Sequence, residues 1–531
     1  MTTETEAPAR RVWLGLIAVS LGVALIVVDI TIVNVIVAPI IDDLGITSIE
    51  AQWIQESYAI VFAALLLLAG RLSDLHGARR IFLIGLTVFG LTSLLAALAP
   101  NGELLIAARF LQGIGGALIL PTSLALVNAS FTGKARGQAF AIWGSTIGAA
   151  AAIGPLLGGW LADFSWRWAF GVNIPLVVLI AVGVLRYLPA PQRIPGRVDH
   201  LGAALSITGL GLLAFALIEG RAYGWLHTVA PLTIGEFAWR SGPSPVLLAF
   251  LAAGLALYAC WRRQSTLTRT GGEPLMDVRL FGIRSFRTGN AVTLIVGLGE
   301  FGIIAILPLW LQFTLGYSAL QAGLALVALA AGSFCASGAS FGMTAAPLTQ
   351  VRIGLLLEAA GLALLGLIAG TGTAWWAIAI ALFFYGIGVG FATAQVTNVV
   401  LAEVPAEFSG QGSGIQSTAR ELGSALGIAL LTTVFFSLLG TGVRDRLTDA
   451  GHPAPGELSH TVTESAGAVI PTLSADPATA TVADSARSAM STGIGISSYI
   501  CAGLLLIALA ATAFLSPRTR VSPHTANANK E

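Results

Sequence analysis

The sequence predicts an all-α, multi-pass membrane protein with fourteen transmembrane helices, in two six-helix halves with two additional helices between them. Three observations support this prediction: the composition, a series of apolar runs, and an internal repeat. Of the 531 residues, 55% are hydrophobic and 10% are charged, whereas a soluble domain carries about 25% charged residues. So few charges cannot cover a soluble surface, and we expect most of the chain to lie in a bilayer.

The apolar runs are long enough to span a bilayer, which takes about 20 apolar residues per helix. They lie near 13–39, 52–70, 81–99, 104–128, 139–161, 169–188, 201–219, 245–261, 288–312, 319–340, 353–370, 375–400, 413–439 and 494–515. They lack the alternation of barrel strands, and an open sheet cannot cross lipid, so we expect helices. The first run is too long for a signal peptide and is interpreted as an uncleaved span.

An internal repeat relates the fourth and fifth runs to the twelfth and thirteenth at one constant shift along the chain. The matches are Phe110, Gly113, Ile114, Gly115, Gly137, Gln138, Ile142, Ala152 and Gly154 with Phe383, Gly386, Ile387, Gly388, Gly410, Gln411, Ile415, Ala425 and Gly427. The organisation that we expect is a tail 1–12, a half 13–188, two extra helices 201–261, a loop 262–287, a half 288–515 that contains the loop 440–493, and a tail 516–531. Duplicated halves are typical of secondary transporters, whose substrate site lies between the halves.

Basic residues predict the orientation. With the N-terminus inside the cell, 20 of the 28 Lys and Arg residues lie on the cytoplasmic side and six lie outside, while Arg109 and Arg420 fall within spans. The positive-inside rule therefore supports two cytoplasmic termini. The loop 440–493 would then lie outside. Its Ser, Thr, Ala, Pro and Gly content favours a solvated spacer without its own core, and the alternative is a small structured cap over the outer mouth.

The remaining composition argues against several classes of protein. The net charge is +1 and no basic run resembles a nucleic-acid patch, so we expect no nucleic-acid partner. The three cysteines lack metal-ligand spacing, and the six histidines fall in loops or at span edges, so we expect no metal and no cofactor. Because there is no ATP-binding motif, no nucleophile–base pair in the spans and no sizeable soluble domain, an ion-driven transporter is favoured over an enzyme or a sensor.

The segment GRLSDLHGARR, residues 70–80, follows the second run. Gly70 and Gly77 permit close helix approach and a tight turn. Asp74 can pair with Arg71, with Arg79, or with a helix end across the loop. This spacing is far more specific than that of an ordinary positively charged loop.

This loop resembles the signature loop of the major facilitator superfamily, where it acts as a cytoplasmic conformational latch. Other segments resemble the fourteen-span drug:proton antiporters of that superfamily, and together they cover nearly the whole chain. They are VVDITIVNV at 27–35, RFLQGIGGA at 109–117, GPLLGG at 154–159, WRWAFGVNIP at 166–175, LPLWLQFTLGYSALQAGLAL at 307–326 and RELGSALGIA at 420–429.

The resemblance implies the major facilitator fold, proton coupling and drug-like substrates. It also implies two sets of working residues, a latch of Gly70, Asp74, Gly77, Arg79 and Arg80, and an antiporter motif of Gly154, Pro155, Gly158 and Gly159. The chain departs from the family in three places. Ala150 stands where a further glycine is usual, Glu56 stands where a small hydroxyl residue is usual, and the second half lacks a good copy of the latch loop.

Asp29 lies within a strongly apolar run, where an ionised carboxylate costs at least about 2.5 kcal/mol. We interpret it as a proton carrier, because burial favours the neutral acid while a nearby Arg109 favours the anion. A cationic cargo would then compete with the proton, and Gln112 would act as a polar relay. The alternative is a structural ion pair between Asp29 and Arg109. Asn34 faces about 140° away from Asp29 around the helix, so we expect it to bond a neighbouring span.

Other buried acids are further candidates. Glu300 lies two residues from the position that Asp29 takes at the repeat shift, so we interpret it as a second proton or cation site, with a local salt bridge as the alternative. Glu56 and Glu358 are candidates for the substrate cavity, and Glu358 has a structural pair with Arg352 as its alternative.

The other charges in or near the spans receive structural interpretations. We expect Arg420 and Glu421 to pair locally or across the halves. Glu219 and Arg221 flank the outer end of the seventh run, where we expect them to be interfacial.

Tyr58, Trp310 and Gln312 complete the cavity candidates. Aromatic rings can stack on a flat or cationic ligand. The plainer alternative is that the two aromatic residues anchor their spans at the membrane interfaces.

Together these features predict a proton-coupled secondary transporter of the bacterial cytoplasmic membrane, which exports hydrophobic, cationic drugs or toxic metabolites by alternating access. The alternative is a proton-coupled importer of a small organic solute or a metal chelate, and a more remote one is a non-transporting membrane sensor. The expected partners are the small-molecule substrate, protons and the lipid bilayer. We expect a monomer.

Overall fold

A computed structural model of the chain describes residues 10–188, 195–234, 237–343 and 345–515. Most of the expected tails 1–12 and 516–531 therefore lies outside the described residues. So do the side chains of Asn34 and Pro155. The bond expected from Asn34 to a neighbouring span stays a prediction.

The N-terminal half follows the expected apolar runs. Its helices are α1 (Arg10–Leu44), α2 (Ser48–His76), α3 (Ala78–Ala97), α4 (Gly102–Ser130), α5 (Gly133–Ala162), α6 (Trp168–Gly171) and α7 (Asn173–Tyr187). Local chemistry sets the breaks between them. Thr47 and Glu50 form a capping box at the start of α2, and Asn101 caps α4, which satisfies free amides at both helix starts. Gly77, between α2 and α3, has a φ of 88°, which residues with a Cβ rarely adopt.

The two additional helices follow the N-terminal half and pack on each other, and the first of them also packs on α2. This region comprises α8 (His200–Tyr223), the short antiparallel pair β1 (Leu232–Ile234) and β2 (Phe237–Trp239), α9 (Pro245–Thr270) and the 3₁₀ helix η1 (Val278–Gly282). Asp199, just before α8, accepts hydrogen bonds from Arg263 of α9 at 2.7–2.9 Å. Burial opposes the ionised form, but the bonds from Arg263 hold the pKa of Asp199 below its usual value.

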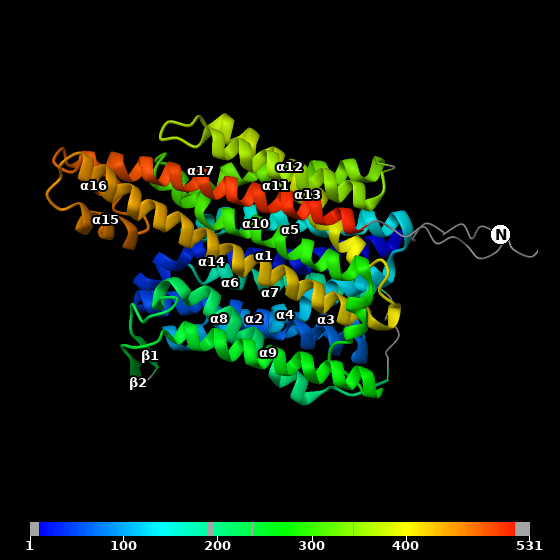
Figure 1. Cartoon of the computed structure of the whole chain (residues 1–531). Coiled ribbons are helices and arrows are strands. Elements are labelled where there is room, and N and C mark those ends of the chain that lie inside the picture. Colours follow the sequence, from blue (N-terminus) through cyan, green and yellow to red (C-terminus); the bar gives the residue numbers. More distant parts are fainter. Residues whose placement is uncertain (1–9, 189–194, 235–236, 344, 516–531) are drawn as a thin grey trace, which may run out of the picture.

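The C-terminal half repeats the arrangement of the first and ends in longer helices. Its elements are α10 (Arg284–Phe313), α11 (Ala319–Gly342), α12 (Pro347–Ile368), α13 (Trp375–Leu401), η2 (Ala406–Phe408), α14 (Ser409–Asp449), α15 (Pro455–Glu464), α16 (Ile470–Ala475), α17 (Ala480–Ala511) and η3 (Thr512–Leu515). α17 ends on the side at which α1 begins (Figure 1). We call this side the N-terminal side.

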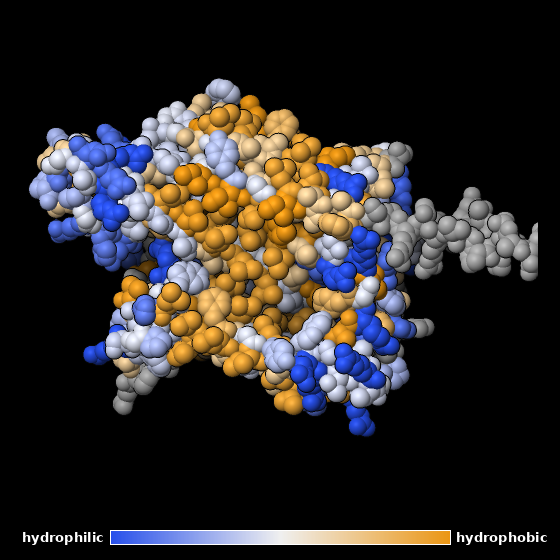
Figure 2. Space-filling model, in the orientation of Figure 1, coloured by the Kyte–Doolittle hydropathy of each residue, from blue (hydrophilic) through white to orange (hydrophobic). Residues whose placement is uncertain are grey.

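The number of spans agrees with the expected fourteen. Within the described residues, thirteen helices are long and apolar enough to cross a membrane, and the two parts of α5, Gly133–Ala151 and Leu156–Ala162, make a fourteenth span if they count as one. These parts are inclined by 41° at a break that holds a glycine and a proline, the usual cause of a helix kink. Apolar residues cover the middle of the molecule, and hydrophilic residues gather at both ends (Figure 2).

The positions of the helices follow the repeat found in the sequence. The first residues of α4 and α13, Gly102 and Trp375, stand at the same shift as Phe110 and Phe383. The first residues of α1 and α10 stand at nearly the same shift. The halves meet where α5 packs on α11 and α13, and where α2 packs on α14.

The segment 440–493 is largely helical, so the expectation of a solvated spacer without a core is wrong. α14 and α17 extend into it, and α15 and α16 lie between them. Val462, Ile470 and Val482 are fully buried there, because apolar side chains at helical spacing can form a small core even in a Ser- and Ala-rich segment. We call residues 440–493 the cap, and the end of the molecule that carries it, opposite the N-terminal side (Figure 1), the cap side.

Candidate functional site

Asp29 lies in a closed polar network inside the N-terminal half. Its carboxylate pairs with the guanidinium of Arg109 from α4 and accepts hydrogen bonds from Gln112 Nε2 and Asn173 Nδ2, both at 2.9 Å. Ser93 of α3 accepts further bonds from the same two amides, at 2.9 and 3.2 Å. All five side chains are at most 1% exposed, so the network is sealed from solvent in this conformation.

Arg109 has further partners on α2 and α4. Its Nε donates to the carbonyl oxygen of Ile54 at 3.1 Å, and its Nη1 donates to Gln112 Oε1 at 2.8 Å. The guanidinium carbon lies 4.5 Å from the ring centroid of Tyr58 and 5.8 Å from that of Phe170. Tyr58 is 1% exposed, so its ring contacts the Arg109 cation and does not face an open cavity.

Sequence reasoning named Asp29, Arg109 and Gln112, and the structure brings these three together. It missed Ser93 and Asn173. Asn173 lies in the quoted segment WRWAFGVNIP, and Ser93 is a polar residue in an apolar span. A polar residue in a span is a usable signal for such a network, although the sequence does not tell which neighbour it meets.

This arrangement links the charge of Asp29 to the packing of α1 against α4. The ionised carboxylate is fully satisfied by its donors. Protonation of Asp29 would leave the Arg109 cation buried without its counter-ion, which is costly in a low dielectric. A movement between α1 and α4 would relieve that cost. The same satisfied network also fits the structural ion pair that the sequence left open as the alternative.

The C-terminal half holds a second buried ion pair, between Glu300 of α10 and Arg420 of α14. Arg420 Nη2 lies 3.0 Å from Glu300 Oε2, and the guanidinium carbon lies 5.7 Å from the ring centroid of Phe301. The salt bridge considered for Glu300 is therefore present. Its partner Arg420 pairs across two helices of one half rather than with the adjacent Glu421.

Glu358 of α12 is fully buried, and neither carboxyl oxygen has a hydrogen-bond partner in the described part of the chain. The structural pair considered between Glu358 and Arg352 is not formed. Arg352 instead donates to the hydroxyl and carbonyl oxygens of Thr512, at 3.0 and 3.1 Å. Because an unpaired charge is costly inside a protein, the neutral acid is the form that fits this site.

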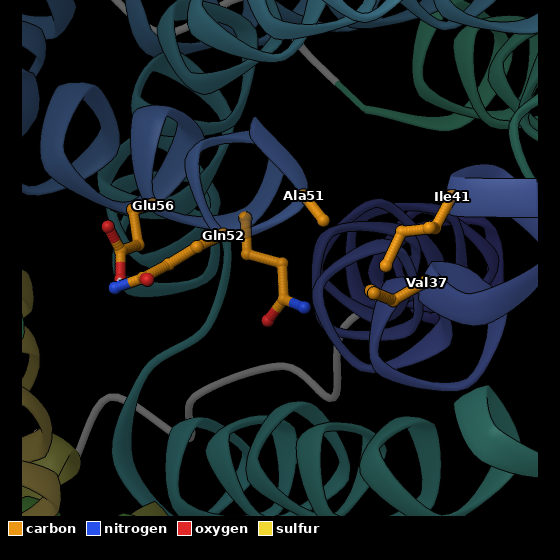
Figure 3. A pocket seen from close by; sticks show the side chains of 6 residues that line it. Val37, Ile41, Ala51, Gln52 and Glu56 are labelled. Carbon is orange, nitrogen blue, oxygen red and sulfur yellow. The ribbon is translucent and has the colours of Figure 1, made fainter. Parts of the chain in front are cut away.

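Glu56 lines a cavity of about 270 Å³ between the cap-side ends of α1 and α2 (Figure 3). The other lining residues are Val37, Ile41, Ala51, Gln52 and Gln55. Gln52 Nε2 donates to Glu56 Oε1 at 2.7 Å and to Glu219 Oε2 of α8 at 3.3 Å. Glu219 is fully buried near the cap-side end of α8, and its expected place at the membrane interface stays a prediction.

The last turns of α2 join the two halves on the N-terminal side. Asp74 accepts hydrogen bonds from the backbone amides of Gly410 at 2.6 Å and Gln411 at 2.9 Å, at the start of α14. A carboxylate there satisfies free amides and favours the helix dipole. Gly70 packs on the same segment, since a Cβ at Gly70 would lie 2.5 Å from the Gly410 oxygen and 2.9 Å from Gly414 Cα. Of the partners considered for Asp74, a helix end is the one that forms these hydrogen bonds.

The other latch residues stay close to the N-terminal half. Arg79 Nη2 donates to the Leu185 oxygen of α7 at 2.7 Å, Gly77 forms the turn, and Arg80 is exposed. The part of these three residues in a latch stays a prediction.

The glycines of the antiporter motif bring α5 close to α1. A Cβ at Gly154 would collide with Thr31, two residues after Asp29, and a Cβ at Gly158 would lie 2.9 Å from a side-chain atom of α1. Gly159 faces open space. Two of these glycines therefore allow the helix that carries Asp29 to pack tightly against α5.

Trp310 and Gln312 lie apart from the cavity beside Glu56. Trp310 is fully buried, and its Nε1 donates to Ser491 Oγ of α17 at 3.1 Å, so it belongs to the packing between α10 and α17. Gln312 donates to the Pro308 oxygen of its own helix at 3.3 Å. Among the described residues, no group of three or more His, Cys, Asp or Glu could hold a metal ion.

Two matching bundles of membrane helices, with buried ion pairs inside each and a polar contact between them, characterise a secondary transporter rather than an enzyme. The chain belongs to the Major Facilitator Superfamily, whose sequence profile matches residues 19–428. The family predicted from the sequence motifs is thus confirmed.

Relatives include transport and resistance proteins. The chain is 33% identical to the "Probable actinorhodin transporter" of Streptomyces coelicolor, over 86% of this chain and 78% of that protein. It is 32% identical to the "Multidrug efflux pump LfrA" of Mycolicibacterium smegmatis, over 96% of this chain and 97% of that protein. The "Puromycin resistance protein pur8" of Streptomyces alboniger is 32% identical, over 81% of this chain and 83% of that protein.

Solved structures share the fold at low sequence identity. The human organic anion transporter MFSD10 superposes with a TM-score of 0.58 at 16% identity, over 96% of this chain and all of that chain. The proton:xylose symporter XylE gives a TM-score of 0.58 at 14% identity, over 95% of each chain. These likenesses establish the fold, and the predicted fold class is confirmed.

Proposed function

We propose that the protein exports hydrophobic, cationic small molecules across the bacterial cytoplasmic membrane in exchange for protons. The names of the relatives support export, since they include an efflux pump and resistance proteins. The membrane carboxylates Asp29, Glu56 and Glu300 favour a cationic cargo. The distribution of basic residues supports cytoplasmic termini, and we expect the monomer to be the working unit.

The observation that supports proton coupling most directly is the buried network of Asp29 and Arg109. Both carboxyl oxygens of Asp29 are paired in this conformation. Proton uptake by Asp29 would free Arg109 from its counter-ion and so favour a different packing of α1 against α4. Cargo that carries a positive charge favours the ionised acid, so cargo and proton compete by linkage.

The latch suits alternating access in this scheme. In this conformation Asp74 holds the start of α14, which keeps the halves together on the N-terminal side. The cavity beside Glu56 lies at the opposite end. We assign this conformation to the outward-facing part of the cycle, and release of the latch would open the cytoplasmic side.

Transport in inverted membrane vesicles tests this function. Asp29→Asn should abolish the uptake of a cationic dye driven by a pH gradient, because the amide cannot exchange a proton. Asp43→Asn is the matched control, since Asp43 lies at the end of the same helix, pairs with Arg167 outside the network, and should leave uptake intact. Unchanged proton coupling in Asp29→Asn, with normal expression, would contradict the assignment of Asp29.

The importer considered from the sequence makes the opposite prediction in the same vesicles. Reversal of the pH gradient should stop dye accumulation by an exporter that exchanges cargo for protons. An importer that moves cargo and protons together would begin to accumulate cargo when the gradient is reversed. The sign of the response separates the two functions.

A further inference from the structure

We propose that Glu56 and Glu219 form a second proton-binding site, in which two carboxyl groups share one proton at the junction of α2 and α8. The proposal deepens the proton-driven export proposed above and rests on it. α8 is one of the two helices that separate the six-helix halves. The site therefore gives this additional pair of helices a chemical role.

A single amide clamps the two acids. Gln52, one helical turn before Glu56, donates from Nε2 to Glu56 Oε1 at 2.7 Å and to Glu219 Oε2 at 3.3 Å. A primary amide has two N–H hydrogens, and both are used here. Figure 3 shows the Gln52 amide beside the carboxyl group of Glu56.

Each acid keeps a second buried oxygen, Glu56 Oε2 and Glu219 Oε1, with no hydrogen-bond partner in the described structure. Glu219 is fully buried, and one oxygen of each acid lies within 3.3 Å of the same nitrogen, Gln52 Nε2, which holds the two carboxyl groups close together. Two ionised carboxylates at this separation repel strongly, whereas one proton between them forms an O–H···O⁻ bond. The pair therefore lacks one hydrogen, which a bound proton supplies.

Charged and titratable neighbours do not supply this hydrogen. Arg221 follows Glu219 by two residues, but its guanidinium carbon lies 3.7 Å from the ring centroid of Phe436 in α14. Tyr223 lies within electrostatic range of both acids, but none of the hydrogen bonds in the described part of the chain runs from its hydroxyl group to Glu56 or Glu219. Among the described ion pairs, none includes Glu56 or Glu219.

Beyond the polar Gln55, which lines the cavity, the surroundings are apolar or hold satisfied groups. α9 contributes Val246 and Ala249 to a cluster with the cap-side part of α8, and α1 contributes Val37 and Ile41 to the cavity. Glu50, on α2, is held in its capping box. A low dielectric with few competing donors strengthens the shared-proton bond.

The cavity gives the site access from the cap side. Glu56 and Gln52 line it (Figure 3), and Gln52 is exposed at the surface, while Glu219 lies buried behind them. α2 also carries the carbonyl of Ile54 that binds Arg109. A proton taken up from the cap side is therefore held on the helix that supports the Arg109–Asp29 pair.

Infrared difference spectroscopy of the purified full-length protein in lipid nanodiscs tests the proposal. In a Glu358→Gln background, which removes the other buried acid that fits as neutral, the protein should show a carboxylic-acid C=O band that disappears as the pH rises, from about one proton per protein. Glu56→Gln and Glu219→Gln should each lose this band, and Glu103→Gln, an exposed acid on α4, should keep it. Asp29→Asn should also keep it while losing coupled export, so a failure of this site is distinguishable from a failure of the proposed function.

Two outcomes would overturn the proposal. The first is a band that persists in both glutamine variants while their elution from a sizing column matches that of the wild type. The second is a band that Na⁺ or K⁺, compared with choline at equal ionic strength, displaces near neutral pH, because the pair would then be a metal-cation site. The double variant Glu56→Gln/Glu219→Gln, whose amides can still bond each other, checks that folding is retained.

Discussion

The two halves of the bundle share helix positions but satisfy their buried acids differently. In the N-terminal half, Asp29 receives hydrogen bonds from three side chains on two helices and carries no free oxygen. In the C-terminal half, Glu300 has Arg420, whereas Glu358 is fully buried without a partner in the described structure. Apart from Glu56 at its junction with α8, the N-terminal half is built around a charged site, whereas the C-terminal half combines a charged pair with an acid that fits as neutral.

The repeat shift shows that these sites are not copies of each other. At the shift that relates Phe110 to Phe383, Asp29 falls on Gly302, Glu300 falls on Val27, and Glu358 falls on Gly85. Small residues and helix boundaries correspond between the halves, because close backbone packing needs them at fixed places. The duplication thus preserved packing, while the polar chemistry became particular to each half.

The largest expected effect follows removal of the arginines. Arg109→Met should lower the free energy of unfolding by about 3–5 kcal/mol, because it leaves a buried carboxylate unpaired. Arg420→Met should lower the free energy of unfolding by less, since Glu300 has fewer side-chain donors than Asp29. Chemical unfolding in mild detergent measures both.

If the two arginine variants lost equal amounts of unfolding free energy, the proposed difference between the buried acids of the two halves would be contradicted. The double variant Asp29→Asn/Arg109→Met is the matched control. It should recover part of the loss, because both members of the pair are then neutral.

A smaller effect is expected at the contact between the halves. Asp74→Ala should reduce the free energy that keeps the halves in contact on the N-terminal side by about 1–3 kcal/mol, because two backbone amides lose their acceptor. Spin labels at Lys134→Cys and Glu407→Cys, both exposed on that side, should then report a larger population of long distances. His76→Ala, an exposed change near the same turn, is the control. An unchanged distance distribution in Asp74→Ala would show that Asp74 does not hold the halves together.

The smallest effect is expected at Glu358. Glu358→Met replaces an unsatisfied buried acid with an apolar side chain of similar length, so it should stabilise the protein by about 1 kcal/mol. Thermal unfolding measures the change. A loss of stability comparable to that of Arg420→Met would mean that Glu358 is paired and charged. The buried acids of the two halves would then be satisfied in the same way.

Much of the fold could be predicted because lipid imposes strict rules. Long apolar runs must be helices, and the repeat revealed the halves and the two additional helices. The composition of the cap, by contrast, predicts a spacer without a core, and this prediction is wrong. Its core depends on a few side chains such as Val462 and Ile470, which a Ser- and Ala-rich composition conceals.

The candidate site was predicted in part. Asp29, Arg109 and Gln112 stand out because polar residues are rare in spans. The structure adds Asn173 and Glu219, whose partners lie 144 and 167 residues away in the chain. A single sequence does not show which distant residues are in contact, so the hydrogen bond between Gln52 and Glu219 could not be predicted from it.

The cap has a practical consequence for work on the protein. A transporter whose mass lies mostly within a detergent belt offers few landmarks for aligning particle images in electron cryomicroscopy. The extended ends of α14 and α17, with α15 and α16 packed on them through Val462 and Ile470, form a helical projection at one end of the molecule (Figure 1). An antibody fragment raised against this projection would mark the orientation of each particle without touching the buried acids.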